Sequence, residues 1–426
     1  MLKRVVPALV LAAAAVCSTT RMLAVTPSSS GQDVTVHEWG TFTTVAGEDG
    51  RAVDWLPLGG PTDLPCFVER YQNPTPVVNP ADDPYGKANL FYNSENQAPL
   101  DYETARTGLS GKVRMETPVL YFYAPRETTA HVRVQFPRGL MTEWYPHATV
   151  AQPAINRTTL SNTNVVSAID WPEVKIQPAA TPVFPTEPGE SHYYAARETD
   201  AAPLEVAGQQ EKFLFYRGVA SFDVPMTAVA LATGGVHVTN LAAGVMPSLV
   251  LFENRGGRLG YRVVTDVQRE VTIDPPTFTG DFAGLRVELE RMLVTAGLYP
   301  KEATAMVETW RRSWFEEGTR VFYVVPSGAL ANILPLAVTP APAHVARVFV
   351  GRMEIMTPAI LSTVSAAIQR GDTATIARYG RFLGPIADRL LATAPATTSS
   401  RISGAASAAM TSYLARASSC GVSAAR

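Results

Sequence analysis

The distribution of proline is the feature that most restricts how this chain can fold. The 426 residues include 33 prolines, about 7.7% of the chain against an ordinary share of about 5%, and 19 of them lie between Pro57 and Pro203. Proline interrupts helices and cannot donate a hydrogen bond within a sheet ladder. We therefore expect strands joined by long ordered loops in this stretch, and such loops often carry function.

The residues between and beyond these prolines predict strands over residues 34–275. Polar and apolar residues alternate in His131–Phe136, which is typical of a half-buried strand. Met115–Tyr123 and Lys212–Tyr216 are more continuously apolar and aromatic, so we expect both strands to be covered on two faces. Two further apolar runs flank Asn254–Gly257, whose Asn and Gly residues favour a hairpin turn.

Helical periodicity replaces the strand pattern near Asp281. The apolar residues of 282–296 lie on one helical face, and Pro300 fits the first turn of the next helix. In that second helix Trp310 and Trp314 continue an apolar stripe, so we expect both to be core residues. Residues 393–426 are rich in Ala, Ser and Thr, and we expect a poorly ordered tail apart from a short helix around Met410–Arg416.

These patterns predict an α+β protein. Residues 34–275 should form a sandwich-like, mostly antiparallel, β-rich domain with proline-rich loops, and residues 281–392 a helix-rich region with a few strands. A hydrophobic content of 46% excludes a disordered chain. The formal net charge of -2 provides no basic surplus for nucleic-acid binding.

The first 24 residues have the pattern of a signal peptide. Lys3 and Arg4 precede the apolar run Val5–Val16, which is shorter than the roughly 20 residues needed to span a bilayer. We therefore expect a periplasmic or secreted protein with no membrane span after signal removal. A lipoprotein attached through Cys17 is the less favoured alternative, because the bulky Val16 precedes that cysteine where a small residue is expected.

Common catalytic motifs are absent from the sequence. It contains no G-x-S-x-G, S-x-x-K, P-loop or C-x-x-C pattern, and His37-Glu38 does not continue to H-E-x-x-H because residue 41 is Thr. Cys66 and Cys420 remain after signal removal, and an oxidising compartment permits them to pair, although the sequence does not supply the required geometry.

The most distinctive run is Val34–Phe42, with the sequence VTVHEWGTF. It resembles the start of the mature chain in a group of secreted bacterial proteins that has no assigned activity. The resemblance extends through Arg114–Pro118, His192–Glu198 and Trp314–Gly318. It implies export and a common fold, and it adds no mechanism. Arg114-Met-Glu and Arg352-Met-Glu both precede a Thr-Pro at different distances, which we interpret as coincidence.

Glu38 is the most informative residue of this run. In a regular strand it shares a face with Val34, Val36 and Phe42, where an unpaired carboxylate would be costly. The same parity places Arg114 and Glu116 together on the face of Leu120 and Phe122, so Arg114 is the first candidate partner for Glu38. The structural interpretation is a buried polar network. The functional interpretation is a pair of carboxylates tuned for acid–base catalysis.

Four acid–tryptophan dipeptides form a second pattern. They could present a glycan surface, because indoles stack on sugar rings, or they could reflect simple strand alternation with Trp pointing inward. The candidate binding residues from this pattern, with two arginines added, are Trp39, Trp55, Trp144, Trp171, Arg114 and Arg197.

Two functional hypotheses follow. The first, slightly preferred, is an exported envelope protein that binds a glycan or a partner protein through its proline-rich loops. The second is a secreted hydrolase whose candidate catalytic residues are His37, Glu38, Glu116 and His192. Five of the six histidines lie in the β-rich part, but no pair has ligand spacing, so we expect no metal and no other cofactor.

Overall fold

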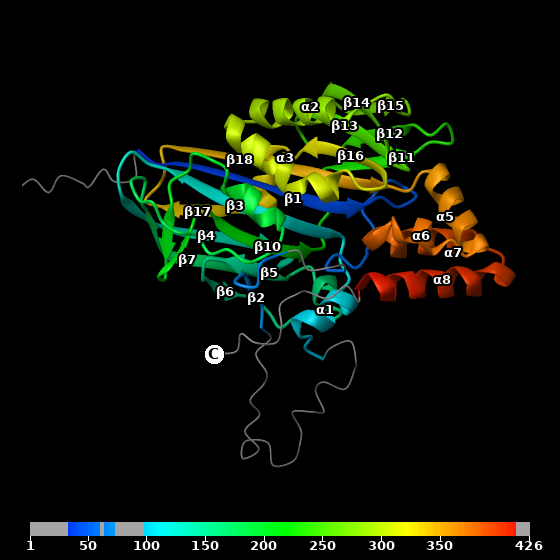
Figure 1. Cartoon of the computed structure of the whole chain (residues 1–426), viewed down its shortest axis with the longest axis horizontal. Coiled ribbons are helices and arrows are strands. Elements are labelled where there is room, and N and C mark those ends of the chain that lie inside the picture. Colours follow the sequence, from blue (N-terminus) through cyan, green and yellow to red (C-terminus); the bar gives the residue numbers. More distant parts are fainter. Residues whose placement is uncertain (1–32, 60–63, 73–97, 415–426) are drawn as a thin grey trace, which may run out of the picture.

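The computed structural model of the chain describes residues 33–59, 64–72 and 98–414 (Figure 1). The predicted signal peptide and Cys420 lie outside the described residues. The fold is α+β, with antiparallel and mixed sheets in the N-terminal two-thirds and helices in the C-terminal part, as predicted.

A nine-stranded sheet forms the centre of the molecule. Among the described pairings, only β1 with β18 is parallel, and the other neighbours are antiparallel. Ten of the eleven residues of β1 are buried, because layers cover both faces of the sheet. The strands in spatial order are β14 (Arg258–Val267), β13 (Met246–Arg255), β16 (Gly318–Val324), β18 (His344–Ile355), β1 (Thr35–Val45), β3 (Val113–Tyr123), β10 (Leu214–Ala220), β5 (Gly139–Tyr145) and β2 (Glu69–Arg70).

A six-stranded sheet packs against one face of this central sheet, and the largest hydrophobic core lies between the two (Figure 1). Its strand β4 (Thr128–Pro137) shows the predicted alternation of buried and exposed residues. The other strands of this sheet are β17 (Leu336–Thr339), β7 (Val166–Ile176), β8 (Leu204–Val206), β9 (Gln209–Glu211) and β6 (Thr149–Ala151). This arrangement is the sheet-on-sheet packing that a sandwich requires.

Two helices cover the opposite face of the central sheet (Figure 1). In α2 (Phe282–Thr295) the Asp281 side chain accepts a hydrogen bond from the backbone N–H of Gly284, which caps the first turn. In α3 (Pro300–Trp314) proline occupies the first position, and Trp310 and Trp314 are buried. The prediction that both tryptophans are core residues is confirmed.

The C-terminal helices lie at one end of the central sheet and have a hydrophobic core of their own, to which Val45 and Trp55 contribute. They are α5 (Pro358–Arg370), α6 (Thr373–Ala377), η4 (Gly380–Phe382), α7 (Leu383–Thr393) and α8 (Ala396–Leu414). The last helix differs from the expected tail. Residues 396–414 are Ala-rich, and alanine has the highest helix propensity, so this segment forms a helix instead of a poorly ordered chain.

The remaining elements are shorter and edge the main layers. A three-stranded sheet contains β11 (Met226–Ala230), β12 (Val236–Asn240) and β15 (Glu270–Ile273). The short helices are α1 (Tyr102–Gly108), η2 (Thr159–Ser161), η3 (His192–Arg197) and α4 (Ser327–Ile333). Within the described ranges, no helix combines the length and the apolar character needed to cross a bilayer.

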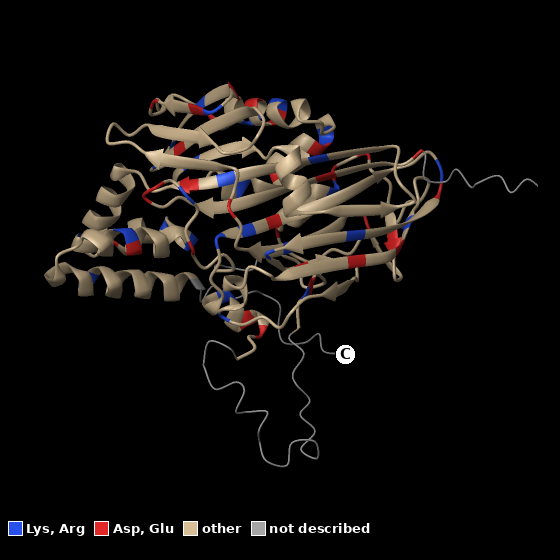
Figure 2. Ribbon diagram, turned by 180° about the vertical axis from the view of Figure 1, so that it is seen from behind, with Lys and Arg blue, Asp and Glu red and all other residues tan. Residues whose placement is uncertain are grey.

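The central sheet crosses the boundary expected near residue 275. Strands β16 and β18 belong to the helix-rich region in sequence, yet they lie beside β13 and β1. The β-rich and helix-rich parts therefore share one sheet. Charges of both signs occur on helices, on loops and within strands of this sheet (Figure 2).

Candidate functional site

Three neighbouring pairings of the central sheet are irregular at the same level. Trp39 pairs with Val119 and Thr41 with Glu116, so β3 carries one more residue than β1 between these pairs. The pairings of β3 with β10 and of β10 with β5 shift beside it. Thr117 has a φ of 45°, in the left-handed region that costs a β-branched residue about 1–3 kcal/mol. Bulges of this kind are common next to functional sites because they redirect side chains.

The bulge at Thr117 reverses the strand parity that the sequence predicts. Leu120 and Phe122 face the core between the two sheets, as expected. Beyond the bulge, Arg114 and Glu116 lie on the opposite face, paired in register with Thr43 and Thr41. The prediction that Arg114 and Glu116 share the face of Leu120 and Phe122 is therefore wrong.

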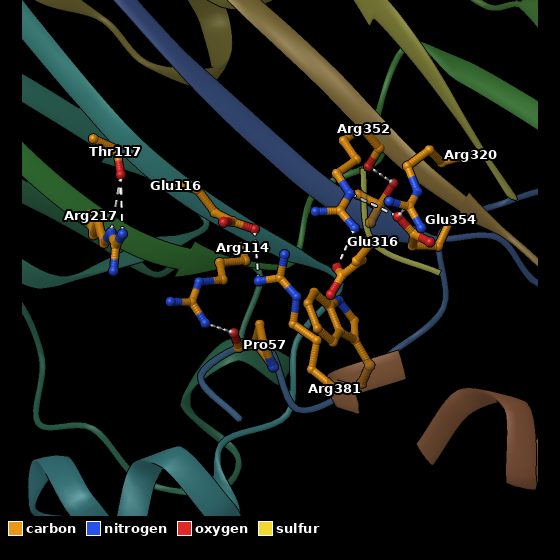
Figure 3. Close-up of polar contacts among 12 residues, drawn as sticks. Pro57, Arg114, Glu116, Thr117, Arg217, Glu316, Arg320, Arg352, Glu354 and Arg381 are labelled. Carbon is orange, nitrogen blue, oxygen red and sulfur yellow. Dashed lines mark hydrogen bonds and ion pairs between the residues drawn. The ribbon is translucent and has the colours of Figure 1, made fainter. Parts of the chain in front are cut away.

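The reversal assembles a row of buried polar side chains across five adjacent strands, which we call the polar belt. Most of its members are labelled in Figure 3. Each has an exposed fraction of 9% or less. The belt consists of Arg320 on β16, Arg352 and Glu354 on β18, Thr41 and Thr43 on β1, Arg114, Glu116 and Thr117 on β3, Arg217 on β10, and Arg381 from η4.

Ion pairs connect five of the ten members of the belt (Figure 3). Arg381 Nη1 lies 2.9 Å from Glu116 Oε1, which joins η4 to the central sheet. Arg320 Nε and Arg352 Nε lie 3.0 and 2.7 Å from the same Glu354 Oε1. These pairs join η4 to β3 and β16 to β18.

A second set of contacts leads out of the belt. Arg352 Nη2 lies 2.7 Å from Glu316 Oε1, in the segment that follows α3. Arg114 Nη1 donates a hydrogen bond of 2.7 Å to the backbone carbonyl of Pro57. Through these contacts the belt also holds the end of α3 and the proline-containing segment after β1.

The guanidinium groups strongly perturb the neighbouring acid. Burial raises the pKa of Glu116, but the charges of Arg381, Arg114 and Arg352 outweigh it, and the pKa falls to about 2. Burial lowers the pKa of Arg320 to about 10, although Glu354 opposes the change. Glu116 is therefore an ionised carboxylate at every physiological pH.

Some polar atoms of the belt lack a protein partner. Arg352 Nη1, Arg381 Nη2 and Thr41 Oγ1 are buried, and none forms a hydrogen bond in the part of the chain that the structure describes. Buried polar groups nearly always have partners, so each unsatisfied group is a position that a water or a ligand could satisfy. Six side-chain atoms of the belt are of this kind within the described residues, and together with the left-handed Thr117 beside them they make the belt the candidate site.

His192 lies at the edge of the belt. Its Nε2 is 3.0 Å from Arg217 Nη2, and its ring packs 5.4 Å from that of Trp310. Arg217 also donates hydrogen bonds to the hydroxyl of the strained Thr117, with distances of 3.3 and 3.2 Å. The belt thus brings together Glu116, His192 and Arg114, three of the residues singled out in the sequence.

Glu38 lies on the opposite face of the same sheet, away from the belt. Its side chain is fully buried and accepts hydrogen bonds from the Tyr216 hydroxyl and from Arg347 Nε, the latter at 2.5 Å. Burial, with the charge of Glu38, raises the pKa of Tyr216. The prediction that Glu38 is buried and paired with a basic or hydroxyl group is confirmed, but the expected partner Arg114 is wrong because of the bulge.

His37 belongs to another buried network. Its Nδ1 is 2.8 Å from Glu302 Oε2 at the start of α3, and Glu302 Oε1 accepts a hydrogen bond of 2.8 Å from the Tyr123 hydroxyl. This network joins β1 to α3. The four candidate catalytic residues therefore occupy three places, with only Glu116 and His192 at the belt.

The tryptophans of the acid–tryptophan pattern are all buried and belong to three different cores. Trp39 packs beneath α2 and α3, Trp144 and Trp171 pack between the two sheets, and Trp55 packs with the C-terminal helices. They form no exposed aromatic strip for a sugar. Trp55 nevertheless borders the belt, with the Arg381 guanidinium 5.9 Å from its ring.

The last candidate binding residue, Arg197, holds η3 in place. Its Nε donates a hydrogen bond of 2.9 Å to Glu211 Oε1, and its Nη2 donates one of 2.8 Å to the Pro185 carbonyl. No motif in the sequence marks Arg217, Arg320 or Arg381. The repeated Arg-Met-Glu, interpreted above as coincidence, is a signal for the belt: Arg114-Met-Glu and Arg352-Met-Glu both contribute to it, from the strands that flank β1.

Within the described ranges, no group of three or more His, Cys, Asp and Glu side chains is close enough to hold a metal ion. Cys66 is disulfide-bonded. Neither protein-family models nor the curated proteins searched gave a match to this chain.

Proposed function

We propose that the chain is an exported protein of the cell envelope that binds a small polar ligand, such as the end of a glycan, at the polar belt. The observation that carries this proposal is the belt itself. Buried arginines, a hydroxyl and a carboxylate line up at a strained bulge, and several of their hydrogen-bonding atoms have no partner among the described residues. Strain and unsatisfied polar atoms are characteristic of binding sites.

The depth of the belt favours a small ligand over a folded partner. Its members are at most 9% exposed and lie beneath the C-terminal helices and the segments around η3. The flat surface of a folded protein cannot contact atoms at that depth, whereas a small molecule is the kind of ligand that buried sites bind. The proposed binding site therefore lies on the central sheet and not in the proline-rich loops.

The alternative of a secreted hydrolase is less well supported. General acid–base catalysis needs groups that share a site and have pKa values near the working pH. Glu38 and His37 lie outside the belt, and Glu116 is held ionised by three arginines. An ionised carboxylate with so low a pKa is a weak proton acceptor.

Thr41 and Thr319 provide a matched pair of variants for testing the site. Both hydroxyls are buried without a hydrogen-bond partner in the described part of the chain, but Thr41 belongs to the belt and Thr319 precedes the belt residue Arg320 on β16. Replacing an unsatisfied hydroxyl by a methyl group removes no hydrogen bond within the protein. We therefore expect Thr41→Val and Thr319→Val to unfold like the wild type.

The experiment is a binding screen of the mature protein against neutral and acidic mono- and oligosaccharides, by ligand-observed NMR. The proposal predicts saturable binding that Thr41→Val weakens and Thr319→Val leaves unchanged. Turnover of any saccharide would instead support the hydrolase. Binding that ignores Thr41, or no binding across the panel, would overturn the assignment of the site.

A further inference from the structure

Three of the guanidinium groups of the belt act on one carboxylate, that of Glu116. Arg381 forms an ion pair with Glu116, and the charges of Arg114 and Arg352 also act on that carboxylate. The guanidinium carbons of Arg352 and Arg381 lie 5.1 and 5.0 Å from the centre of the same Phe382 ring. These two groups are therefore at most about 10 Å apart, on a shared aromatic support.

The carboxylates nearby do not use all the donors of these arginines. Arg352 directs Nε to Glu354 and Nη2 to Glu316, while its Nη1 has no partner in the described residues. Arg381 directs Nη1 to Glu116, while its Nη2 has none there. Figure 3 shows the Arg381 guanidinium beside Glu116 and Arg114, and the Arg352 guanidinium beside Glu354 and Glu316.

Arg114 adds a further positive charge to this side. Its described hydrogen bond goes to the carbonyl oxygen of Pro57, and within the described ranges no carboxylate lies within 4.0 Å of it. Four arginines, Arg114, Arg320, Arg352 and Arg381, thus share three carboxylates, Glu116, Glu316 and Glu354. A buried guanidinium without a negative partner is costly, so the arrangement favours an additional anion.

We infer that the belt binds an oxyanion, a carboxylate or phosphate group carried by the ligand, through Nη1 of Arg352, Nη2 of Arg381 and the guanidinium of Arg114. The planar guanidinium matches both kinds of oxyanion and donates two parallel hydrogen bonds to either. The Thr41 hydroxyl is placed to donate one more, because it lies opposite Glu116 in the β1–β3 register. This inference rests on the function proposed above and specifies the chemical class of its ligand.

Three probes distinguish the two sources of the oxyanion. Inorganic phosphate, glucuronate and glucose are titrated into the mature protein by calorimetry at constant ionic strength. Glucose has the ring of glucuronate without its carboxylate and serves as the neutral control. Binding of phosphate alone identifies a phosphate-bearing ligand. Binding of glucuronate alone identifies a carboxylate-bearing ligand. Either result supports the inference.

Two variants should change anion binding in opposite directions. Arg114→Gln removes a charged donor and should weaken binding about tenfold to hundredfold. Glu116→Gln keeps the shape of the side chain but removes the negative charge that competes with the ligand, so it should tighten binding. A purely structural role of the belt would not reverse the sign between these two variants. Arg126→Gln, at an exposed arginine paired with Asp33, is the control and should bind like the wild type.

The inference is overturned if neither anion binds, or if Arg114→Gln and Glu116→Gln both bind like the wild type. If Arg114→Gln does not unfold cooperatively and is therefore not folded, Glu116→Gln decides the test. Tighter anion binding by Glu116→Gln supports the inference, and unchanged binding overturns it. Failure of the inference is distinct from failure of the proposed function. Neutral saccharides that bind in a Thr41-dependent way, without competition from phosphate or glucuronate, would retain the site and exclude the oxyanion.

Discussion

At the scale of single residues, buried charges in this protein are paired in ways that depend on which face of the sheet they occupy. Glu38 and Arg347 form an isolated pair on one face, supported by the Tyr216 hydroxyl. Glu116 lies on the other face among several arginines. Both carboxylates are buried, but Glu38 has one arginine partner whereas several arginines act on Glu116. Substitution of the two residues should therefore affect stability differently.

Glu38→Gln should destabilise the protein. Gln keeps the shape of the side chain but leaves Arg347 buried without its counter-charge, which typically costs about 3–5 kcal/mol. The free energy of unfolding from urea titration measures this, with Glu38→Gln combined with Arg347→Gln as the control that removes both charges and should recover part of the loss. Equal or higher stability, together with loss of an enzymatic activity, would instead identify Glu38 as catalytic.

Glu116 should make stability depend on acidity. Its pKa is about 2 in the folded protein and about 4.3 in an unfolded chain, so the folded state favours the ionised form. A lowered pKa contributes stability above the unfolded value, and this contribution is lost as the pH falls from about 5 to about 2. The difference in unfolding free energy between wild type and Glu116→Gln should shrink over this range. If the difference in unfolding free energy did not change with pH, the low pKa assigned to Glu116 would be wrong.

At the scale of elements, the bulge across β3, β10 and β5 is possible only because small residues lie beside it. A Cβ atom at Gly218 would lie 2.4 Å from the carbonyl oxygen of Leu140, on the neighbouring strand. A Cβ atom at Gly40 would lie 2.7 Å from the Phe349 ring. Any larger residue at Gly218 must displace the backbone of β5. A larger residue at Gly40 meets the Phe349 side chain instead, which can move more easily than backbone.

Gly218→Ala should therefore destabilise the protein by about 1–3 kcal/mol, as overpacking usually does. It should also weaken ligand binding at the belt, because Arg217 is the adjacent residue. Gly328→Ala in α4 is the matched control, since no atom lies within 4 Å of a Cβ at Gly328 and its backbone is helical. That change should be neutral or stabilising by about 0.5–1 kcal/mol. Thermal unfolding measures the melting temperatures of both variants, and that of Gly218→Ala should be the lower. Equal melting temperatures would contradict the prediction.

At the scale of the whole molecule, the C-terminal helices are tied to the belt by charge as well as by packing. Arg381 pairs with Glu116 across this boundary, and Arg389 pairs with Glu48 nearby. The helices have their own hydrophobic core, yet the ligand site proposed here is incomplete without them. The protein should therefore lose ligand binding if these helices are removed, even where the sheets persist.

The mature protein should begin between residues 16 and 25. The motivation is the charged start followed by a short apolar run, which is the pattern that signal peptidases process. Edman sequencing of material recovered from the periplasm or the medium would identify the first residue. An intact Met1 in that material would contradict the prediction of a cleaved signal.

The sequence predicted the elements well where periodicity is local. The hairpin at Asn254–Gly257, the helices beginning near Phe282 and Pro300, and the alternation in β4 are all present. These features depend on contacts between residues that are close in the chain, or on the apolar face that a single element presents. The burial of Glu38 followed from the same reasoning, because strand parity holds over the few residues from Val34 to Phe42.

The tertiary structure alone decided the composition of the belt. One extra residue at Thr117 moved Arg114 and Glu116 to the other face, and no local pattern marks a bulge that neighbouring strands must accommodate. Arg352 and Arg381 reach Glu116 from more than two hundred residues away, through strand order and helix packing. Local propensity therefore determined which segments became strands and helices, whereas the pairing of distant strands determined which charges met.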